Sequence, residues 1–355
     1  MGLTWLFAQK RLIIIAGLII GALGAMLVEW GNPANMGICI ACFWRDITGA
    51  IGLHRASVVQ YIRPEILGMV FGSLFSALFF REFRSRGGST PLIRFILGAF
   101  FMIGALVFLG CPVRALLRLA GGDLNGITAL AGIIVGALIG IFFLRQGFNL
   151  GRAIRMKAAA GWTFPLLVLG LLLILLFEPE FLFESKTGPG SLHAAIGVSI
   201  AVGAGVGLLA QRTRMCFVGG WRDIFLTRDF YLVSGIASFF VGAIITNAVL
   251  GNITWGFADQ PVAHTEHVWN FMGMLLAGLA ATLLGGCPLR QTILAGEGDT
   301  DAGIAILGMV AGAAFAHNFM TAAGPDGIGD FSVMAVIIGI VFCLGIGTFF
   351  RETGE

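Results

Sequence analysis

The chain has 355 residues, of which 57% are hydrophobic and 12% charged, and its formal net charge is +3. Soluble domains carry roughly a quarter charged residues, so the composition excludes a soluble globular protein and indicates an integral membrane protein. The small positive charge gives no reason to expect nucleic acid as a partner. The lipid bilayer is the first partner that the sequence predicts.

Ten apolar segments follow one another along the chain, and about 20 apolar residues are needed to cross the hydrocarbon core as a helix. No small-residue cleavage site follows the first segment, so we expect an uncleaved span there rather than a signal peptide. The sequence therefore predicts an all-α membrane protein with a single membrane domain, 1–355, and spans at 12–29, 65–81, 92–110, 127–144, 162–177, 191–209, 231–250, 268–286, 302–318 and 331–349.

The charges in the loops predict the orientation. Basic residues crowd two loops, near 81–94 and 145–157. In contrast, the loop at 178–190 is acidic, and the loops at 251–267 and 319–330 contain no lysine or arginine. Because basic loops stay in the cytoplasm, we expect a multi-pass protein of the bacterial inner (plasma) membrane with both termini cytoplasmic.

A duplication runs through the chain. Gly110–Arg114 reads Gly-Cys-Pro-Val-Arg and recurs about 176 residues later as Gly286–Arg290, which reads Gly-Cys-Pro-Leu-Arg. A second cysteine recurs at nearly the same offset: Cys39 and Cys216 each stand five residues before Trp-Arg-Asp. Two matching offsets indicate one duplicated unit rather than two chance matches.

The duplicated units have the arrangement of inverted repeats. Repeat one covers 12–144 and repeat two covers 191–318, with a linking span at 162–177 and an extra C-terminal span at 331–349. Repeat two begins five crossings after repeat one, so it enters the membrane from the opposite side. In transporters built this way the substrate site lies at the interface of the repeats, near the middle of the bilayer.

Two short segments inside the repeats are predicted to be re-entrant half-helices. Cys111–Leu119 and Cys287–Ala295 have room for about 14 Å of helix, half the hydrocarbon core, and each ends at a glycine-rich break. Pro112 and Pro288 suit the first helical position, because proline lacks the N–H that would be unpaired there. The stretches that follow the other two repeated cysteines are candidates for the same geometry.

The paired cysteines then stand beside free backbone N–H groups at the positive end of a helix, a place that favours an anion. A thiol is a soft, weak hydrogen-bond donor, so two facing half-helices with Cys111 and Cys287 predict a site for a soft anion such as thiosulfate or a selenium analogue. Cys39 and Cys216 extend this pathway. The alternative is that each Cys-Pro only starts a short helix.

The charged residues near the cysteines allow two interpretations. Arg45 and Arg222 either pair with the adjacent aspartates to anchor short helices or attract anions to the two mouths of the pathway. The same alternatives hold for Arg114 and Arg290. The remaining pair of repeated carboxylates is predicted to cap the following spans, at positions Asp123 and Asp299.

A Cys-x-x-Cys at Cys39 and Cys42 suggests a rival function, a membrane thiol redox protein acting with a quinone or a partner protein. The second copy has Gly219 in place of Cys42, so the symmetry favours a transporter, and we expect no enzyme activity. His264 and His267 form only an isolated pair, so no metal site is predicted, and no cofactor is expected because phosphate-binding motifs are also absent.

The Gly-Cys-Pro segments, together with Met215-Cys216-Phe217 before Trp-Arg-Asp, resemble the YeeE/YedE family of membrane transporters. The resemblance implies an importer that moves thiosulfate inward, with Cys39, Cys111, Cys216 and Cys287 passing the ion on by thiol hydrogen bonds. Asp46-Ile-Thr-Gly and Leu53-His54-Arg55 look more like the YedE branch associated with selenium metabolism, which implies a selenium compound instead. A cytoplasmic sulfur- or selenium-handling partner is implied by the resemblance alone.

Overall fold

A computed structural model describes residues 3–351 of the protein, in which two very short strands accompany the helices. The strands β1 (Arg86–Gly87) and β2 (Ile154–Arg155) pair antiparallel. In chain order the helices are α1 (Leu3–Glu29), α2 (Ile40–Ala50), α3 (Pro64–Phe79), α4 (Pro91–Phe108), α5 (Pro112–Ala120), α6 (Asn125–Arg145), α7 (Ala158–Phe177), the short 3₁₀ turn η1 (Pro189–Ser191), α8 (Ile196–Thr213), α9 (Gly219–Thr227), α10 (Tyr231–Leu250), α11 (His267–Leu284), α12 (Pro288–Gly296), α13 (Thr300–Asn318) and α14 (Ser332–Phe349).

The expected all-α membrane protein is confirmed. Within the described part of the chain, nine segments are long and apolar enough to cross a membrane. The tenth expected span, 65–81, corresponds to α3, an apolar helix of 16 residues. At 1.5 Å per residue α3 reaches only about 24 Å, so it is shorter than an ordinary span.

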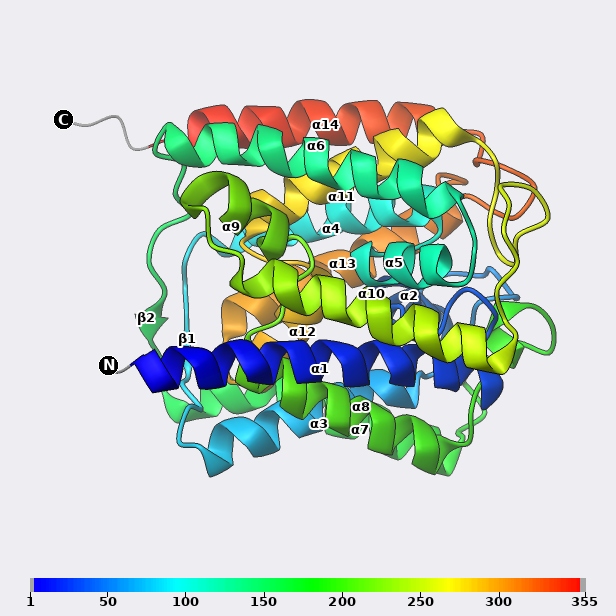
Figure 1. The fold of residues 1–355 in the computed structure, drawn as a ribbon, viewed down its shortest axis with the longest axis horizontal. Coiled ribbons are helices and arrows are strands. Elements are labelled where there is room, and N and C mark those ends of the chain that lie inside the picture. Colours follow the sequence, from blue (N-terminus) through cyan, green and yellow to red (C-terminus); the bar gives the residue numbers. More distant parts are fainter. Residues whose placement is uncertain (1–2, 352–355) are drawn as a thin grey trace.

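The long helices lie side by side with their axes roughly along one direction (Figure 1). At one end of the bundle lie β1, β2, the beginning of α1 and the end of α14; we call this the strand end. At the opposite end, which we call the far end, lie the loops at 30–39, 178–195 and 251–266 (Figure 1). Hydrogen bonds tie the far-end loops together, for example from the Asn35 side chain to the Pro261 carbonyl, 3.3 Å.

Four pairs of long helices form the core of the bundle: α1 packs on α10, α3 on α8, α4 on α13 and α6 on α11. Glycines at these contacts bring the backbones together, as their spacing in the sequence predicts. A Cβ at Gly136 of α6 would lie 2.1 Å from the carbonyl oxygen of Leu275 of α11. A Cβ at Gly308 of α13 would likewise lie 2.0 Å from the carbonyl oxygen of Phe95 of α4.

The helices α7 and α14, which belong to neither predicted repeat, lie on opposite outer sides of the bundle (Figure 1). Each carries several exposed large apolar side chains, among them Leu166 and Leu176 on α7 and Val341 and Phe342 on α14. Such surfaces suit contact with lipid. The four short helices α2, α5, α9 and α12 lie between the long ones and position the residues of interest.

Candidate functional site: buried thiols at the starts of four short helices

Each short helix begins at or just after one of the repeated cysteines. Cys39 is the residue before α2, Cys111 precedes α5 and Cys287 precedes α12, while Cys216 stands three residues before the start of α9. The exposed fractions of these four cysteines are 0%, 0%, 0% and 5%, respectively. The starts of the short helices, where backbone N–H groups are unpaired, are therefore inside the protein.

From these buried starts the short helices run to opposite ends of the bundle. The chain after α5 reaches the far end, where Thr254 N donates to the Gly121 carbonyl, 2.9 Å. After α2 the Leu53 carbonyl accepts from the Asn318 side chain, 2.9 Å, also at the far end. After α12 the chain reaches the strand end, where Arg84 N donates to the Glu297 carbonyl, 3.0 Å. At the same end, the Phe225 carbonyl of α9 accepts from Arg145, 2.7 Å.

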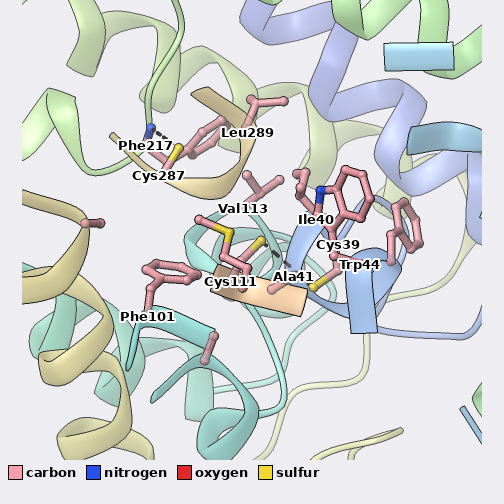
Figure 2. Close-up of a cluster of buried hydrophobic side chains, with 14 of the residues drawn as sticks. Cys39, Ile40, Ala41, Trp44, Phe101, Cys111, Val113, Phe217, Cys287 and Leu289 are labelled. Atoms are coloured by element: carbon pink, nitrogen blue, oxygen red, sulfur yellow. Dashed lines mark hydrogen bonds between the residues drawn. The ribbon is translucent and has the colours of Figure 1, made fainter. Parts of the chain in front are cut away.

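Three thiols meet in the half of the protein toward the far end, and we call Cys39, Cys42 and Cys111 the three-thiol cluster. The Sγ atoms of Cys39 and Cys42 are 2.6 Å apart, and those of Cys39 and Cys111 are 3.9 Å apart. The backbone N–H of Cys42 donates to Cys39 Sγ, 3.3 Å, which caps the start of α2. Figure 2 shows Cys39 and Cys111 approaching each other from two different helices.

Arg114 lies against the three-thiol cluster and is fully buried. Its Nη1 donates to Cys42 Sγ, 3.3 Å, and to the Leu109 carbonyl, while Nε donates to the Asn35 carbonyl, 2.8 Å. The third nitrogen, Nη2, donates to the Val262 carbonyl, 3.0 Å. All of these partners are neutral, and among the described residues no carboxylate forms an ion pair with this guanidinium. A buried charge without a counter-ion is costly, so the site is suited to an anion.

The half toward the strand end holds two thiols rather than three. The Phe217 N–H donates to Cys287 Sγ, 3.4 Å, and the Cys287 N–H donates to Cys216 Sγ, 3.4 Å. Figure 2 shows the first of these contacts in the same view as Cys39 and Cys111. Here the arginine after the Cys-Pro has a counter-ion: Arg290 Nη1 lies 3.4 Å from Glu297 Oε1. The position that matches Glu297 in the first copy is Gly121, which has no side chain to pair.

In each Trp-Arg-Asp segment the aspartate forms an ion pair with the arginine that precedes it. Arg45 Nε and Nη2 both donate to Asp46 Oδ1, 2.8 and 2.6 Å, and Arg63 Nε donates to Asp46 Oδ2, 2.7 Å; all three side chains are buried. In the second copy Arg222 pairs with Asp223 Oδ1, 2.8 Å, and both remain partly exposed. Charge pairing of this kind agrees with the anchoring interpretation of Arg45 and Arg222.

The structure also places the prolines and aspartates that the sequence analysis singled out. Pro112 and Pro288 occupy the first position of their helices, as predicted. Asp299 caps α13 by accepting from the Ala302 N–H, 3.1 Å, and pairs with Arg86, 2.7 Å. Asp123 accepts from the Asn125 N–H, 3.0 Å, but the residue before α6 is Leu124, so Asp123 lies one residue outside the cap position. No group of three or more potential metal ligands occurs among the described residues.

Comparison with known proteins identifies the family. Residues 2–139 and 212–346 match the family model described as "Sulphur transport", and these two segments hold all four repeated cysteines. The chain belongs to the sulphur transport family. This assignment confirms the YeeE/YedE resemblance and the expectation of a transporter rather than an enzyme.

One relative of this sulphur transport protein is the thiosulfate transporter TsuA of Spirochaeta thermophila. The two chains are 31% identical over 112 residues, a match that covers 32% of this chain and 33% of TsuA. The aligned part is thus about a third of either protein.

Sequence reasoning missed two charged residues of this sulphur transport protein. Arg63 completes the buried cluster around Asp46, but no pattern linked these two positions. The role of Glu297 could have been predicted from a difference between the two copies. The seventh residue after Arg290 is a glutamate, whereas the seventh residue after Arg114 is a glycine. Comparing the copies for differences, as well as for matches, points to that asymmetry.

Proposed function

We propose that this protein imports thiosulfate along a central pathway formed by Cys39, Cys111, Cys216 and Cys287. The observation that carries the proposal is that four short helices begin inside the protein, each at or just after one of these cysteines. Helix N-termini favour negative charge, and their effect is strongest where water is excluded. Thiols supply soft donors for the terminal sulfur of thiosulfate, and backbone N–H groups supply donors for its oxygens.

The helix contacts support two inverted-topology repeats, 12–144 and 191–318. If α1 corresponds to α8 and α3 to α10, the contact of α1 with α10 has its counterpart in the contact of α8 with α3. If α4 likewise corresponds to α11 and α6 to α13, the contact of α6 with α11 has its counterpart in the contact of α13 with α4. The opposite directions of α2 and α5 against α9 and α12 fit re-entrant half-helices of this arrangement, with α7 at 162–177 as the linking span and α14 at 331–349 as the extra one.

The proposed direction of transport follows from the loop charges. The basic loops lie at the strand end, which the positive-inside rule assigns to the cytoplasm of a bacterial inner membrane, together with both termini. A cavity of about 310 Å³ opens at the far end between α1, α5 and α10 and is lined in part by Asn35, Gln260 and Thr254. A cavity of about 620 Å³ at the strand end is lined by Arg84, Arg86 and Arg155, among others. Anions would enter through the cavity at the far end and leave through the cavity at the strand end.

The two arginines that follow the Cys-Pro pairs would then play different parts. Arg114, which pairs with no carboxylate in the described part of the chain, attracts and holds the anion in the half toward the far end. Arg290 is neutralised by Glu297, so the anion is held more weakly in the half toward the strand end. Because the cysteines are enclosed, the anion can pass only if the short helices of each half move apart, first in one half and then in the other. The structure therefore corresponds to a closed state of the proposed pathway.

A selenium compound is the second candidate cargo. The residues that favoured it in the sequence, Asp46 and His54, brace α2: Asp46 pairs with Arg45 and Arg63, and His54 Nε2 lies 3.0 Å from the Arg45 carbonyl. No hydrogen bond or ion pair connects either side chain to a thiol of the pathway, so they give no basis for preferring selenium. A cytoplasmic sulfur- or selenium-handling protein that receives the anion at the strand end stays a prediction from the family resemblance.

The proposal is tested by uptake into proteoliposomes that contain the purified protein, with thiosulfate, selenite and sulfate compared side by side. We expect saturable thiosulfate uptake, weaker competition by selenite and little by sulfate, which has no terminal soft sulfur. Empty liposomes give the background. Preference for selenite would transfer the cargo assignment to selenium, and no uptake of any of these anions would contradict the proposal.

A further inference from the structure

Cys42 is the one residue of the three-thiol cluster that the proposed pathway does not use. It breaks the symmetry of the repeats, because Gly219 occupies the matching position in the second copy. It also lies in the first turn of α2, where its Sγ is 2.6 Å from that of Cys39. Both sulfur atoms are therefore already within reach of each other, and no movement of a second helix is needed to join them.

The surroundings of this pair restrict what could react with it. Cys39 and Cys42 are both 0% exposed, so a protein or another bulky disulfide cannot approach them, and access limits thiol–disulfide exchange. The buried guanidinium of Arg114, 3.3 Å from Cys42 Sγ and without a carboxylate partner among the described residues, favours a negatively charged reactant. The reactant must therefore be a small anion that follows the same route as the cargo.

We propose that Cys39 and Cys42 form a modification site for polythionates, with tetrathionate as the simplest reactant. The inference rests on the proposed function, because tetrathionate consists of two thiosulfate units joined by a sulfur–sulfur bond. It therefore presents the cargo's own sulfonate end to the pathway. Oxidation of the pair to a disulfide closes the pathway.

The reaction takes place in two exchange steps. Cys42, which lies next to Arg114, gives up its proton and attacks one inner sulfur of tetrathionate; a Cys42 S–S bond forms, the central S–S bond breaks and one thiosulfate leaves. The thiolate of Cys39 then attacks the sulfur of Cys42, forming the Cys39–Cys42 disulfide and releasing the second thiosulfate. Two thiols lose two electrons and two protons, the protons pass to water, and one tetrathionate is reduced to two thiosulfate ions.

The disulfide removes the thiol hydrogen of Cys39. The Sγ atom of Cys39 lies 3.9 Å from the Sγ atom of Cys111. The pathway loses a donor at that point, and the covalent bond fixes the start of α2. The Cys216 and Cys287 pair in the other half has no additional thiol at Gly219. Modification at this site is therefore confined to one half of the protein.

The test treats the full-length protein in proteoliposomes with tetrathionate, removes the reagent, and measures both thiosulfate uptake and the mass of the cysteine-containing peptides. We expect a loss of two hydrogens that maps to Cys39 and Cys42, with uptake at background. Cys42→Ser is expected to take up thiosulfate and to keep doing so after treatment. The matched control, Cys343→Ser in α14, is expected to be inhibited like the unmodified sequence.

Two results would overturn the inference: no disulfide between Cys39 and Cys42 in the treated protein, or inhibition of Cys42→Ser as complete as that of the unmodified sequence. The peptide masses decide the first point even if Cys42→Ser does not fold. Uptake by the reduced, untreated protein is a separate readout. If it is absent while the disulfide still forms, the proposed cargo fails and the modification site stands.

Discussion

Arg114 and Arg290 follow their Cys-Pro pairs at the same distance, yet among the described residues only Arg290 has a carboxylate partner. Arg290 lies 3.4 Å from Glu297, whereas Arg114 donates to carbonyl groups and to the sulfur of Cys42. The difference arises from one position, a glutamate in the second copy and Gly121 in the first. In the proposed pathway, the anion is therefore expected to be held more tightly beside Arg114 than beside Arg290.

Replacing Arg114 with glutamine is expected to weaken thiosulfate uptake severely. The substitution removes a charge-assisted interaction worth about 1.5–3 kcal/mol, which corresponds to a rise in KM of roughly ten- to a hundredfold. Uptake is measured over a range of thiosulfate concentrations, at equal protein levels. Arg222→Gln is the matched control, since Arg222 is partly exposed and paired with Asp223. An unchanged KM for Arg114→Gln would remove Arg114 from the anion site.

Replacing Glu297 with glutamine is expected to have the opposite effect on binding. The charge of Arg290 is then no longer neutralised, so the anion is held more tightly before release, and both KM and the maximal rate of uptake fall. Measuring KM and the maximal rate separately distinguishes this result from simple destabilisation, which lowers the rate alone. A rise in KM would contradict the assigned role of Glu297.

The same residue predicts a dependence on pH at the strand end. Burial raises the pKa of the Glu297 carboxyl above its ordinary value of 4.5, although the nearby Arg290, Arg214 and Arg86 oppose the shift. As the pH on that side falls through the raised pKa, Glu297 gains a proton and its pairing with Arg290 is lost. The unmodified protein is therefore expected to approach the kinetics of Glu297→Gln as the internal pH of proteoliposomes is lowered, whereas the variant shows no such change.

Replacing Asp46 with asparagine is expected to destabilise the fold rather than to change selectivity. Its carboxylate compensates two buried guanidinium groups, those of Arg45 and Arg63. Removing one member of a buried charge cluster costs about 3–5 kcal/mol. Thermal unfolding in detergent measures the loss, and Asp223→Asn serves as the control, because that partly exposed pair contributes about 1 kcal/mol or less. Equal stability of the two variants would contradict the anchoring role.

The sequence predicted that the paired cysteines stand at the starts of short helices, because the same Gly-Cys-Pro segment occurs in both copies of the duplication. Cys111 and Cys287 stand before prolines that start short helices, and both lie where a helix N-terminus is buried. What it could not predict were contacts made only by tertiary packing. Arg63 reaches Asp46 across a turn that follows α2, and the contact of Arg114 with Cys42 depends on how α5 lies against α2. The span predicted at 65–81 agrees with α3 to within two residues at either end.

The most direct test of the cysteine pathway is thiosulfate uptake by proteoliposomes containing Cys111→Ala, Cys287→Ala or the control Cys343→Ala, at matched protein levels. Cys343 is buried in α14, outside both predicted repeats, so its replacement is expected to leave the proposed pathway unchanged. We predict that uptake falls to background in the first two variants and is retained in the third. Full uptake by both Cys111→Ala and Cys287→Ala would contradict the pathway.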